Sequence, residues 1–345
     1  MDTILVTGGC GYIGSHTCVC LLENNYNVVI LDSLINSYEN SIDNIKKILN
    51  KKFININNRI HFIKGDIRNK KLLDKVFAKY ISAKTPITSV IHFAGLKSIN
   101  SSIKNPLDYW DSNIIGTLSL LIAMKENNCF SLIFSSSASV YMPNGKNLLK
   151  ETDIIKPCTP YGKTKACIEE ISKDLCESES NWRVANLRYF NPVGSHSSGF
   201  LKENSRDDRS SNLFPSILKA IKGKEPRLLV FGNDWPTYDG TCVRDFIHVM
   251  DLANAHIEAL SFLKKNKPQN ISINIGTGKG TSVLDVVKTF QEIKGINFNY
   301  EFVERRLGDQ PFVVADNKLA LKLLSWSPTR NISDMCRDYI FNKKP

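Results

Sequence analysis

The stretch that decides the fold is Ile4-Leu5-Val6-Thr7-Gly8-Gly9-Cys10-Gly11-Tyr12-Ile13-Gly14, near the start of the chain. Residues 4–7 predict a short buried strand, and residues 12–22 have the apolar periodicity of a helix. Between them, Gly8, Gly11 and Gly14 follow one another at intervals of three residues. Glycine at such positions permits a tight turn, lets the backbone approach a pyrophosphate and lets the helix pack closely on the strand. The turn would then present the N–H groups of the helix N-terminus to phosphate groups.

An acidic residue strengthens this interpretation, because the glycine triplet alone fits a plain strand-turn-helix equally well. A second predicted strand, residues 27–31, runs directly into Asp32. In a dinucleotide-binding fold this place belongs to the carboxylate that accepts hydrogen bonds from the ribose hydroxyls. A carboxylate there would repel a 2′-phosphate, so the pattern predicts NAD rather than NADP. The alternative, a solvated aspartate at the end of a strand, is less favoured.

The composition is that of a globular protein of one large domain or two ordinary ones, with 345 residues of which 42% are hydrophobic. No apolar run is long enough to span a membrane, and the first residues are already needed for a strand, so we expect neither a membrane span nor a signal peptide. The net charge of +11 would help to capture an anionic substrate. Residues 44–59 are rich in lysine and asparagine without aromatic interleaving, which predicts a solvated helix and loop rather than a nucleic-acid surface.

The nine cysteines and six histidines are scattered along the chain. There is no C-x-x-C pair and no H-E-x-x-H motif. This distribution predicts reduced thiols in a cytoplasmic protein and no metal site.

Strands and helices are expected to alternate through the first half of the chain. Predicted strands end in Gly65-Asp66-Ile67, in Phe93-Ala94-Gly95 and in Ser135-Ser136-Ser137, and helices are predicted over 70–80 and 106–127. The second helix places Leu118, Leu121 and Met124 on one recurring face, the pattern of a packed helix. Repeated strand-helix units with short continuous apolar strands predict a parallel sheet covered on both faces. Ligands of such sheets bind beyond the carboxyl ends of the strands, where Gly8, Asp32, Asp66, Gly95 and Ser137 fall.

A helix is predicted to begin at Thr159-Pro160, with threonine as the N-cap and proline in the first turn. Tyr161 and Lys165 then lie one turn apart on one face. A neighbouring ammonium would lower the pKa of the phenol from its ordinary value of about 10 and make it usable as a base. Taken alone, the pair is more often an exposed tyrosine and lysine on an amphipathic helix.

The second half of the chain alternates less regularly. A shift to Ser, Asp, Arg and Lys over 195–211 marks the boundary of a second region, in which 228–231 and 270–275 are predicted strands. The cluster Gly276-Thr277-Gly278-Lys279-Gly280-Thr281 is not a P-loop, because Ile273 stands at the first glycine position and Gly280 follows the lysine. It is interpreted as a turn before a helix over 283–293.

Taken together, these motifs resemble the extended short-chain dehydrogenase/reductases. The resemblance rests on the glycine-rich turn, Gly65-Asp66-Ile67-Arg68, His92-Phe93-Ala94-Gly95-Leu96-Lys97, Ser135-Ser136-Ser137, Tyr161-x-x-x-Lys165 and Arg188-Tyr189-Phe190-Asn191-Pro192. Phe231-Gly232-Asn233-Asp234, Val243-Arg244-Asp245-Phe246-Ile247-His248-Val249 and Arg305-Arg306-x-Gly308-Asp309 narrow it to the UDP-glucose 4-epimerase family. It extends over residues 4–326, nearly the whole chain.

This resemblance implies a Rossmann-type α/β fold, a doubly wound parallel sheet with a smaller C-terminal substrate-binding domain. The NAD-binding domain would be 1–190, with a return segment near 240–265, and the nucleotide-sugar-binding domain 191–345. The implied catalytic residues are Tyr161, Lys165 and Ser137. The implied NAD-binding residues are Gly8, Gly11, Tyr12, Ile13, Gly14, Asp32, Asn36, Asp66, Ile67, Phe93, Ala94, Gly95, Lys97, Asn113, Tyr161, Lys165 and Tyr189. The implied UDP-hexose-binding residues are Ser137, Tyr161, Asn191, Asn212, Leu213, Phe231, Arg244, Arg306, Asp309 and Val313.

Arg244 and Arg306 suit a diphosphate because a guanidinium grips two phosphate oxygens at once. The alternatives are that Arg244 pairs with Asp245 or Asp309 and that Arg306 is a surface charge. The chain departs from the family at Met142, where a glycine is usual, and at Val313, where many members have a tyrosine. The first departure concerns the conformation of the loop after Val140-Tyr141, and the second concerns the range of sugars.

The reaction that the resemblance implies is inversion at C4 of a UDP-hexose, with Tyr161 as the base, a 4-keto intermediate and NAD reoxidised in each turnover. A 4,6-dehydratase is the alternative enzyme, but similar dehydratases have acidic residues where this chain has Ala138 and Ser139. A non-catalytic NAD-sensing protein is the third possibility, although such a protein could dispense with the Tyr161–Lys165 pair. The family also implies a homodimer, formed through the helices that follow Pro106 and Tyr161.

Overall fold

The computed structural model describes residues 1–340 apart from 53–55, 57, 143–144, 146–147, 204–211 and 307. Every residue proposed for the site lies within the described part. Of the polar boundary segment 195–211, residues 204–211 lie outside it.

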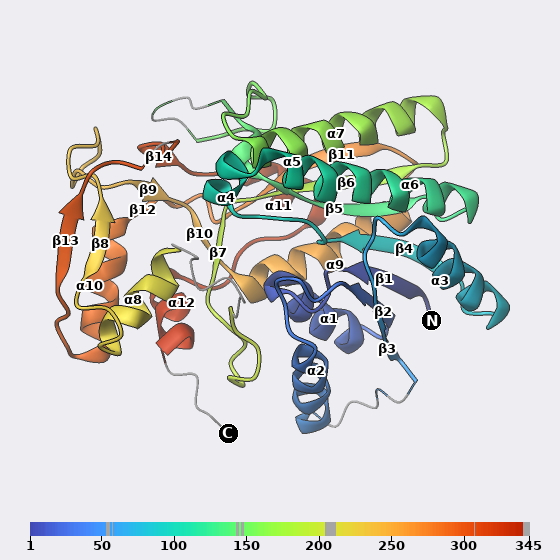
Figure 1. The fold of residues 1–345 in the computed structure, drawn as a ribbon, viewed down its shortest axis with the longest axis horizontal. Coiled ribbons are helices and arrows are strands. Elements are labelled where there is room, and N and C mark those ends of the chain that lie inside the picture. The colour runs from blue at the N-terminus through green and yellow to red at the C-terminus, as the bar shows by residue number, and fades with distance from the viewer. Residues whose placement is uncertain are drawn as a thin grey trace.

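The centre of the molecule is a seven-stranded sheet in which every pair of neighbours is parallel (Figure 1). Its order is β11-β6-β5-β4-β1-β2-β3. The strands are β1 (Thr3–Thr7), β2 (Asn27–Asp32), β3 (Ile60–Lys64), β4 (Ile87–His92), β5 (Ser131–Ser137), β6 (Arg183–Tyr189) and β11 (Asn270–Ile275). The order in which successive strands are added reverses at β1: β2 and β3 lie on one side of it, and β4, β5 and β6 lie on the other. Such a switch point places a ligand-binding crevice at the carboxyl ends of β1 and β4. The predicted Rossmann-type fold is confirmed.

Helices cover both faces of this sheet, which explains why its inner strands are almost fully buried. One core joins the sheet to α1 (Tyr12–Glu23), α2 (Asn40–Lys51), α9 (Val249–Lys265) and α11 (Lys318–Leu324). The other joins it to α3 (Lys70–Ser82), α6 (Gly116–Glu126) and α7 (Pro160–Ser178). In Figure 1 α1 and α2 of the first group lie toward the bottom of the molecule, and α6 and α7 lie toward its top.

The helix predicted over 106–127 is a succession of three segments. These are α5 (Pro106–Tyr109), a π-helical turn η1 (Trp110–Ile115) and α6, and α4 (Ile99–Lys104) precedes them. Leu121 and Met124 are buried as expected, whereas Leu118 is 36% exposed. Leu118, which the sequence pattern placed on the packed face, therefore adds to the apolar surface on the exposed side of this helical stretch.

The second region forms a smaller layer beside the carboxyl ends of the sheet, at the left of Figure 1. It contains β7 (Asn191–Val193) paired with β10 (Phe246–His248), β8 (Leu228–Phe231) paired with β13 (Tyr300–Val303), and β9 (Val243–Arg244) between β12 (Thr281–Ser282) and β14 (Phe312–Val313). A separate core joins α8 (Leu213–Ile221), α10 (Val283–Lys294) and α12 (Ile332–Ile340). The part of the chain that returns to the large sheet is longer than the segment expected near 240–265. Besides α9, strand β11 and helix α11 also pack on this sheet.

No helix in the described part of the chain is long and apolar enough to cross a membrane.

Candidate active site

A cavity of about 750 Å³ opens at the carboxyl ends of the central strands and extends into the second region. Its wall includes every residue proposed from the sequence except Asn113 and Val313. The strand-end residues Gly8, Asp32, Asp66, Gly95 and Ser137 thus lie around one space, as parallel topology requires. A cavity of this size and mixed character can hold a large, elongated small molecule.

The glycine-rich turn leaves room at the floor of this cavity. Gly8 adopts a φ of +71°, and a Cβ there would lie 2.7 Å from the backbone nitrogen of Ala94. A Cβ on Gly14 would lie 2.4 Å from the carbonyl oxygen of Gly8, so α1 packs against the turn at a distance that excludes any side chain. The helix N-terminus after Gly11 meets the cavity with no side chain capping it. This cradle fits a pyrophosphate.

Asp32 is buried and also ties together the loops around the neighbouring end of the cavity. Its Oδ2 accepts a hydrogen bond from the Cys10 backbone N–H at 2.9 Å. Its Oδ1 accepts from the Leu34 N–H and from the Ser37 hydroxyl, both at 2.9 Å. A carboxylate has about four lone-pair positions, so one is left for a ribose hydroxyl. The surroundings of Asp32 therefore fit the adenosine side of NAD.

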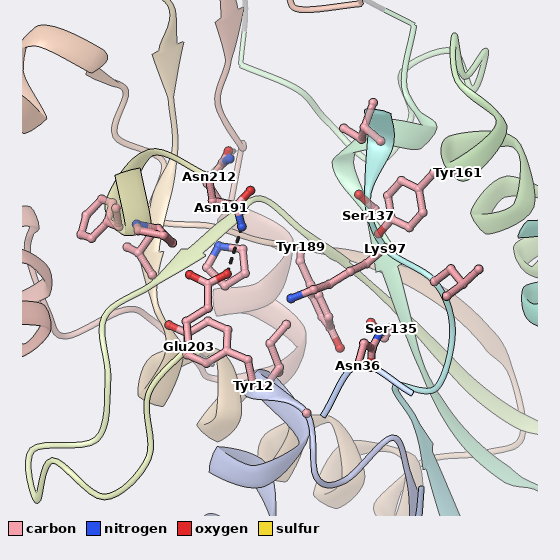
Figure 2. A pocket seen from close by; sticks show the side chains of 18 of the residues that line it. Tyr12, Asn36, Lys97, Ser135, Ser137, Tyr161, Tyr189, Asn191, Glu203 and Asn212 are labelled. Carbon is pink, nitrogen blue, oxygen red and sulfur yellow. Dashed lines mark hydrogen bonds between the residues drawn. The ribbon is translucent and has the colours of Figure 1, made fainter. Parts of the chain in front are cut away.

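The proposed catalytic residues come from β5 and α7, and Figure 2 shows Ser137 and Tyr161 side by side at the cavity. Thr159 caps α7 as predicted, because its hydroxyl accepts a hydrogen bond from the Gly162 N–H at 3.2 Å. The Lys165 Nζ donates to the Ser135 carbonyl oxygen at 2.6 Å and lies 5.8 Å from the centre of the Tyr161 ring. Ser137 acts to lower the pKa of the Tyr161 phenol, and its hydroxyl donates to Ser139 Oγ at 3.2 Å.

Burial decides the proton affinities of this pair. It raises the pKa of Tyr161 to about 12, although the hydrogen bond to Ser137 acts in the opposite direction. It also lowers the pKa of Lys165 to about 7. The expectation that the lysine would lower the pKa of the phenol is wrong, because desolvation by burial is the largest influence on the phenol and raises its pKa. A cation bound beside the phenol would favour its ionised form.

The far end of the cavity carries the two arginines. Arg244 donates from Nη1 to the Gln310 carbonyl oxygen at 2.6 Å, and its Nη2 lies 3.5 Å from Asp309 Oδ1. Arg306 places its guanidinium carbon 3.7 Å from the centre of the Phe231 ring. Both arginines line the cavity, and the partner of Arg244 is Asp309 rather than Asp245.

Between the two ends, Asn212 donates from Nδ2 to Glu203 Oε1 at 2.9 Å (dashed line, Figure 2). Tyr12 projects from α1 toward the same part of the cavity and donates from its hydroxyl to the Gly194 carbonyl oxygen at 2.6 Å. Sequence reasoning proposed Asn212 but missed Glu203. No sequence signal marks this glutamate, because it lies in an irregular segment.

Tyr189 is held by a buried histidine that the sequence also did not reveal. His256 on α9 donates from Nδ1 to the Leu252 carbonyl oxygen at 2.8 Å, which leaves Nε2 to accept from the Tyr189 hydroxyl. Burial lowers the pKa of His256 to about 4, so this acceptor stays neutral at ordinary pH. His256 thus fixes one wall of the cavity without lining it.

Two proposed residues lie behind the wall of the cavity. Asn113, on the π-helical turn, accepts from the Leu96 N–H at 2.7 Å and donates to the Thr164 hydroxyl at 3.0 Å, and so joins the loop after β4 to α7. Val313 on β14 packs in a cluster with Phe190, which does line the cavity. Their proposed ligand contacts remain predictions.

The sequence predicted that the turn at 276–281 is not a P-loop, and the contacts of its backbone agree. The backbone N–H groups of Thr277 and Gly278 donate to the Asp245 carboxylate at 2.7 and 2.9 Å. Helix α10 follows it directly. Among the described residues, no group of three or more His, Cys, Asp or Glu side chains could hold a metal ion.

Comparison with known proteins agrees with this geometry. The profile of the "NAD dependent epimerase/dehydratase family" matches residues 4–276. A UDP-glucose 4-epimerase of Dictyostelium discoideum is 45% identical over 337 residues, 98% of this chain and 94% of that protein. A UDP-glucose 4-epimerase of Drosophila melanogaster is 42% identical over 344 residues, 97% of this chain and 95% of that protein.

Two solved structures are similar throughout. The UDP-glucose 4-epimerase of Stenotrophomonas maltophila with bound NAD and formylated UDP-arabinopyranose superposes with a TM-score of 0.91 at 41% identity, over 98% of this chain and 97% of that one. The UDP-glucose 4-epimerase of Bifidobacterium longum in complex with NAD+ and UDP gives 0.90 at 36% identity, over the same shares. The chain therefore belongs to the NAD-dependent epimerase/dehydratase family, and within it to the UDP-glucose 4-epimerases.

Proposed function

We propose that this protein interconverts UDP-glucose and UDP-galactose by inverting C4, with tightly bound NAD recycled in each turnover. The observation that carries the proposal is that one cavity is lined by the glycine turn with Asp32, by the Tyr161–Lys165 pair and by the two arginines. Residues 1–190 would hold NAD, and residues from 191 onward would hold most of the nucleotide sugar. Comparison supports the same assignment, because relatives with this name align over nearly the whole chain.

The chain's own residues would divide the work as follows. Arg244 and Arg306 hold the diphosphate, and Asn191 and Asn212 hold the groups next to it. Tyr161 takes the proton of the C4 hydroxyl, with Ser137 orienting both oxygens, and later returns it. The NAD held by the first region would supply the hydride acceptor and donor for C4, which is the chemistry that the protein itself lacks. Lys165 holds positive charge near the phenolate.

Inversion needs the 4-keto sugar to present both of its faces in turn, so the anchor must be strong and the hexose pocket loose. Charged side chains gather at the diphosphate end, whereas Phe190, Pro192 and Val193 supply apolar surface farther along the wall. This asymmetry suits a sugar that turns while its nucleotide stays fixed.

The decisive experiment is incubation of the purified protein with UDP-galactose and no added NAD. Formation of UDP-glucose supports the proposal. Loss of water to give a 4-keto-6-deoxy sugar would indicate a dehydratase instead, which the Ala138-Ser139 pair disfavours because a second base is missing. Bound NAD without any turnover would indicate a sensing protein.

Asp32 should make the NAD-free protein prefer NAD to NADP by about tenfold or more, equivalent to about 1.4 kcal/mol. The reason is repulsion between its buried carboxylate and a 2′-phosphate. Titration with each cofactor measures the ratio of the two affinities, and Asp32→Asn should bring this ratio closer to one. Equal affinities in the wild type would mean that Asp32 does not face the ribose.

Val313 should leave space that admits N-acetylhexosamine substrates, although less well than plain hexoses. Val313→Tyr would add a ring beside Phe190, so we expect kcat/KM for UDP-N-acetylgalactosamine to fall about tenfold more than that for UDP-galactose. Val313→Leu, which adds bulk without a ring, should have a smaller effect. An unchanged ratio in Val313→Tyr would show that this position does not control sugar choice.

We further propose that two copies associate through the outer face of α5, η1 and α6. Leu107 is 78% exposed there, and Ile115 and Ile122 are 49% and 50% exposed. Such a row of apolar residues on neighbouring helical turns is typical of an interface. Ile122→Asp should therefore convert a dimer to a monomer in light scattering. Leu321→Asp, at a 58% exposed position on α11, is the matched control and should leave the mass unchanged.

A cytoplasmic location is also proposed. All nine cysteines lie in the described residues and each is a free thiol, as suits a reducing compartment. Localisation of the tagged protein by microscopy tests this.

A further inference from the structure

Three residues spaced four apart, Tyr161, Lys165 and Glu169, lie along one face of α7, and each contacts β5 at a different one of three successive serines. Lys165 donates to the carbonyl oxygen of Ser135 at 2.6 Å. The hydroxyl of the next residue, Ser136, donates to Glu169 Oε1. The third serine, Ser137, acts on the Tyr161 phenol and lowers its pKa. The catalytic face of α7 therefore continues for one turn beyond Lys165.

Glu169 is an unusual residue for this place because it is a buried carboxylate. It is 7% exposed, and its partner Arg188 on β6 is 5% exposed. Arg188 donates from Nε to Oε1 at 3.0 Å and from Nη2 to Oε2 at 2.6 Å. The Ser272 hydroxyl on β11 adds a contact to Oε2 at 3.4 Å. The two-pronged geometry holds the carboxylate in one orientation.

A buried ion pair of this kind needs an explanation other than stability. Removing two charges from water is costly, and apolar residues of similar volume are often as stable or more stable at such a site. Arg188 does bind other parts of the fold, donating from Nη1 to the Tyr141 hydroxyl at 2.8 Å and to the Glu151 carbonyl oxygen at 3.1 Å. An apolar core could also have joined these segments. What an apolar core could not supply is negative charge one helical turn from Lys165.

The groups around Lys165 show why this charge matters. The residues that face Lys165 and its catalytic partner from the surrounding elements are Tyr161 and Glu169 on α7, His92 on β4, Tyr109 on α5, and Arg188 and Tyr189 on β6. Burial raises the pKa of Tyr161 and Tyr189 and lowers the pKa of His92 to about 3, so these three groups are neutral. Glu169 raises the pKa of Lys165, against the larger effect of burial.

We propose that Glu169 is a positioning residue of the active site, which fixes the catalytic face of α7 against β5 and supplies the negative charge that keeps the Lys165 ammonium protonated. Arg188 holds this carboxylate in place through its two-pronged contact. The proposal rests on the proposed function, since it assumes that a protonated Lys165 assists Tyr161.

The test compares how the two charges of the pair affect the alkaline limb of the pH profile of kcat. Glu169→Gln removes the negative charge, so Lys165 loses its proton more easily and the limb should move to lower pH by about one unit. Arg188→Met leaves the negative charge unopposed, so the limb should move to higher pH. Glu169→Asp keeps the negative charge, so its alkaline limb should lie closer to that of the wild type than the limb of Glu169→Gln does. A purely structural pair would lower activity in both variants without shifts of opposite sign, and that result would overturn the proposal.

Glu169→Gln and Arg188→Met each leave an unpaired buried charge and are therefore at risk of not folding. The charge-neutral double variant Glu169→Gln with Arg188→Gln avoids this. The sample is NAD-loaded protein labelled with ¹⁵N-lysine, without substrate. The Lys165 Nζ signal is identified by its loss in Lys165→Arg. We expect this signal to titrate at lower pH in the double variant than in the wild type. Equal midpoints would refute the role of Glu169. A shifted midpoint in a protein that fails to epimerise UDP-galactose would instead refute the proposed function and leave the charge coupling intact.

Discussion

Tyr161→Phe should lower kcat by about 10²–10⁴-fold while leaving NAD and UDP bound. The substitution removes the phenolic oxygen and keeps the ring that fills this part of the cavity wall. Lys165 is a poor replacement for that oxygen as a proton acceptor, since its Nζ already donates to the Ser135 carbonyl oxygen. Turnover of UDP-galactose and the NAD content of the purified protein are the two measurements.

The matched control for this experiment is Tyr238→Phe. Tyr238 is 68% exposed and donates to Asp285 in the second region, so the same hydroxyl is removed away from the cavity. Its kcat should stay within about twofold of the wild type, as expected of an exposed position outside the site. A Tyr161→Phe protein with near-normal kcat would show that another group takes the proton and that Tyr161 is not the base.

Features that depend on adjacent residues could be predicted from the sequence. The glycine turn, the acidic end of β2 and the N-cap at Thr159 each follow from a few neighbouring side chains. The meeting of the strand ends followed too, because parallel strands place their carboxyl ends along one edge. For this reason most of the proposed residues line the same cavity.

Features that depend on packing between distant segments could not be predicted. The pKa of Tyr161 is an example, since spacing places an ammonium nearby but does not reveal how far both groups are buried. The partner of Tyr189 is another, because His256 comes from a helix 67 residues further along the chain. The return of β11 to the sheet and the brace that Asn113 forms likewise need the assembled fold.

Gly14→Ala should lower NAD affinity by about tenfold or more and reduce the melting temperature. In an ordinary helix this substitution is favourable by about 1 kcal/mol, so the expected sign is opposite to that of intrinsic helix propensity. The reason is that the new Cβ would lie 2.4 Å from the Gly8 carbonyl oxygen, a backbone atom that cannot rotate away. Relief requires α1 and the turn to separate, which costs about 1–3 kcal/mol and disturbs the pyrophosphate cradle.

Gly223→Ala is the control for this prediction. Gly223 has a φ of +66°, but nothing lies within 4 Å of a Cβ placed there, so alanine brings backbone strain without a clash. We expect a stability loss of about 1 kcal/mol and a normal content of NAD. NAD per chain, measured by absorbance after denaturation, and thermal unfolding of both variants separate the two effects. A Gly14→Ala protein that retains full NAD and melts at or above the wild-type temperature would show that the turn can move aside, and that close packing of α1 on the Gly8 carbonyl is not what shapes the cofactor site.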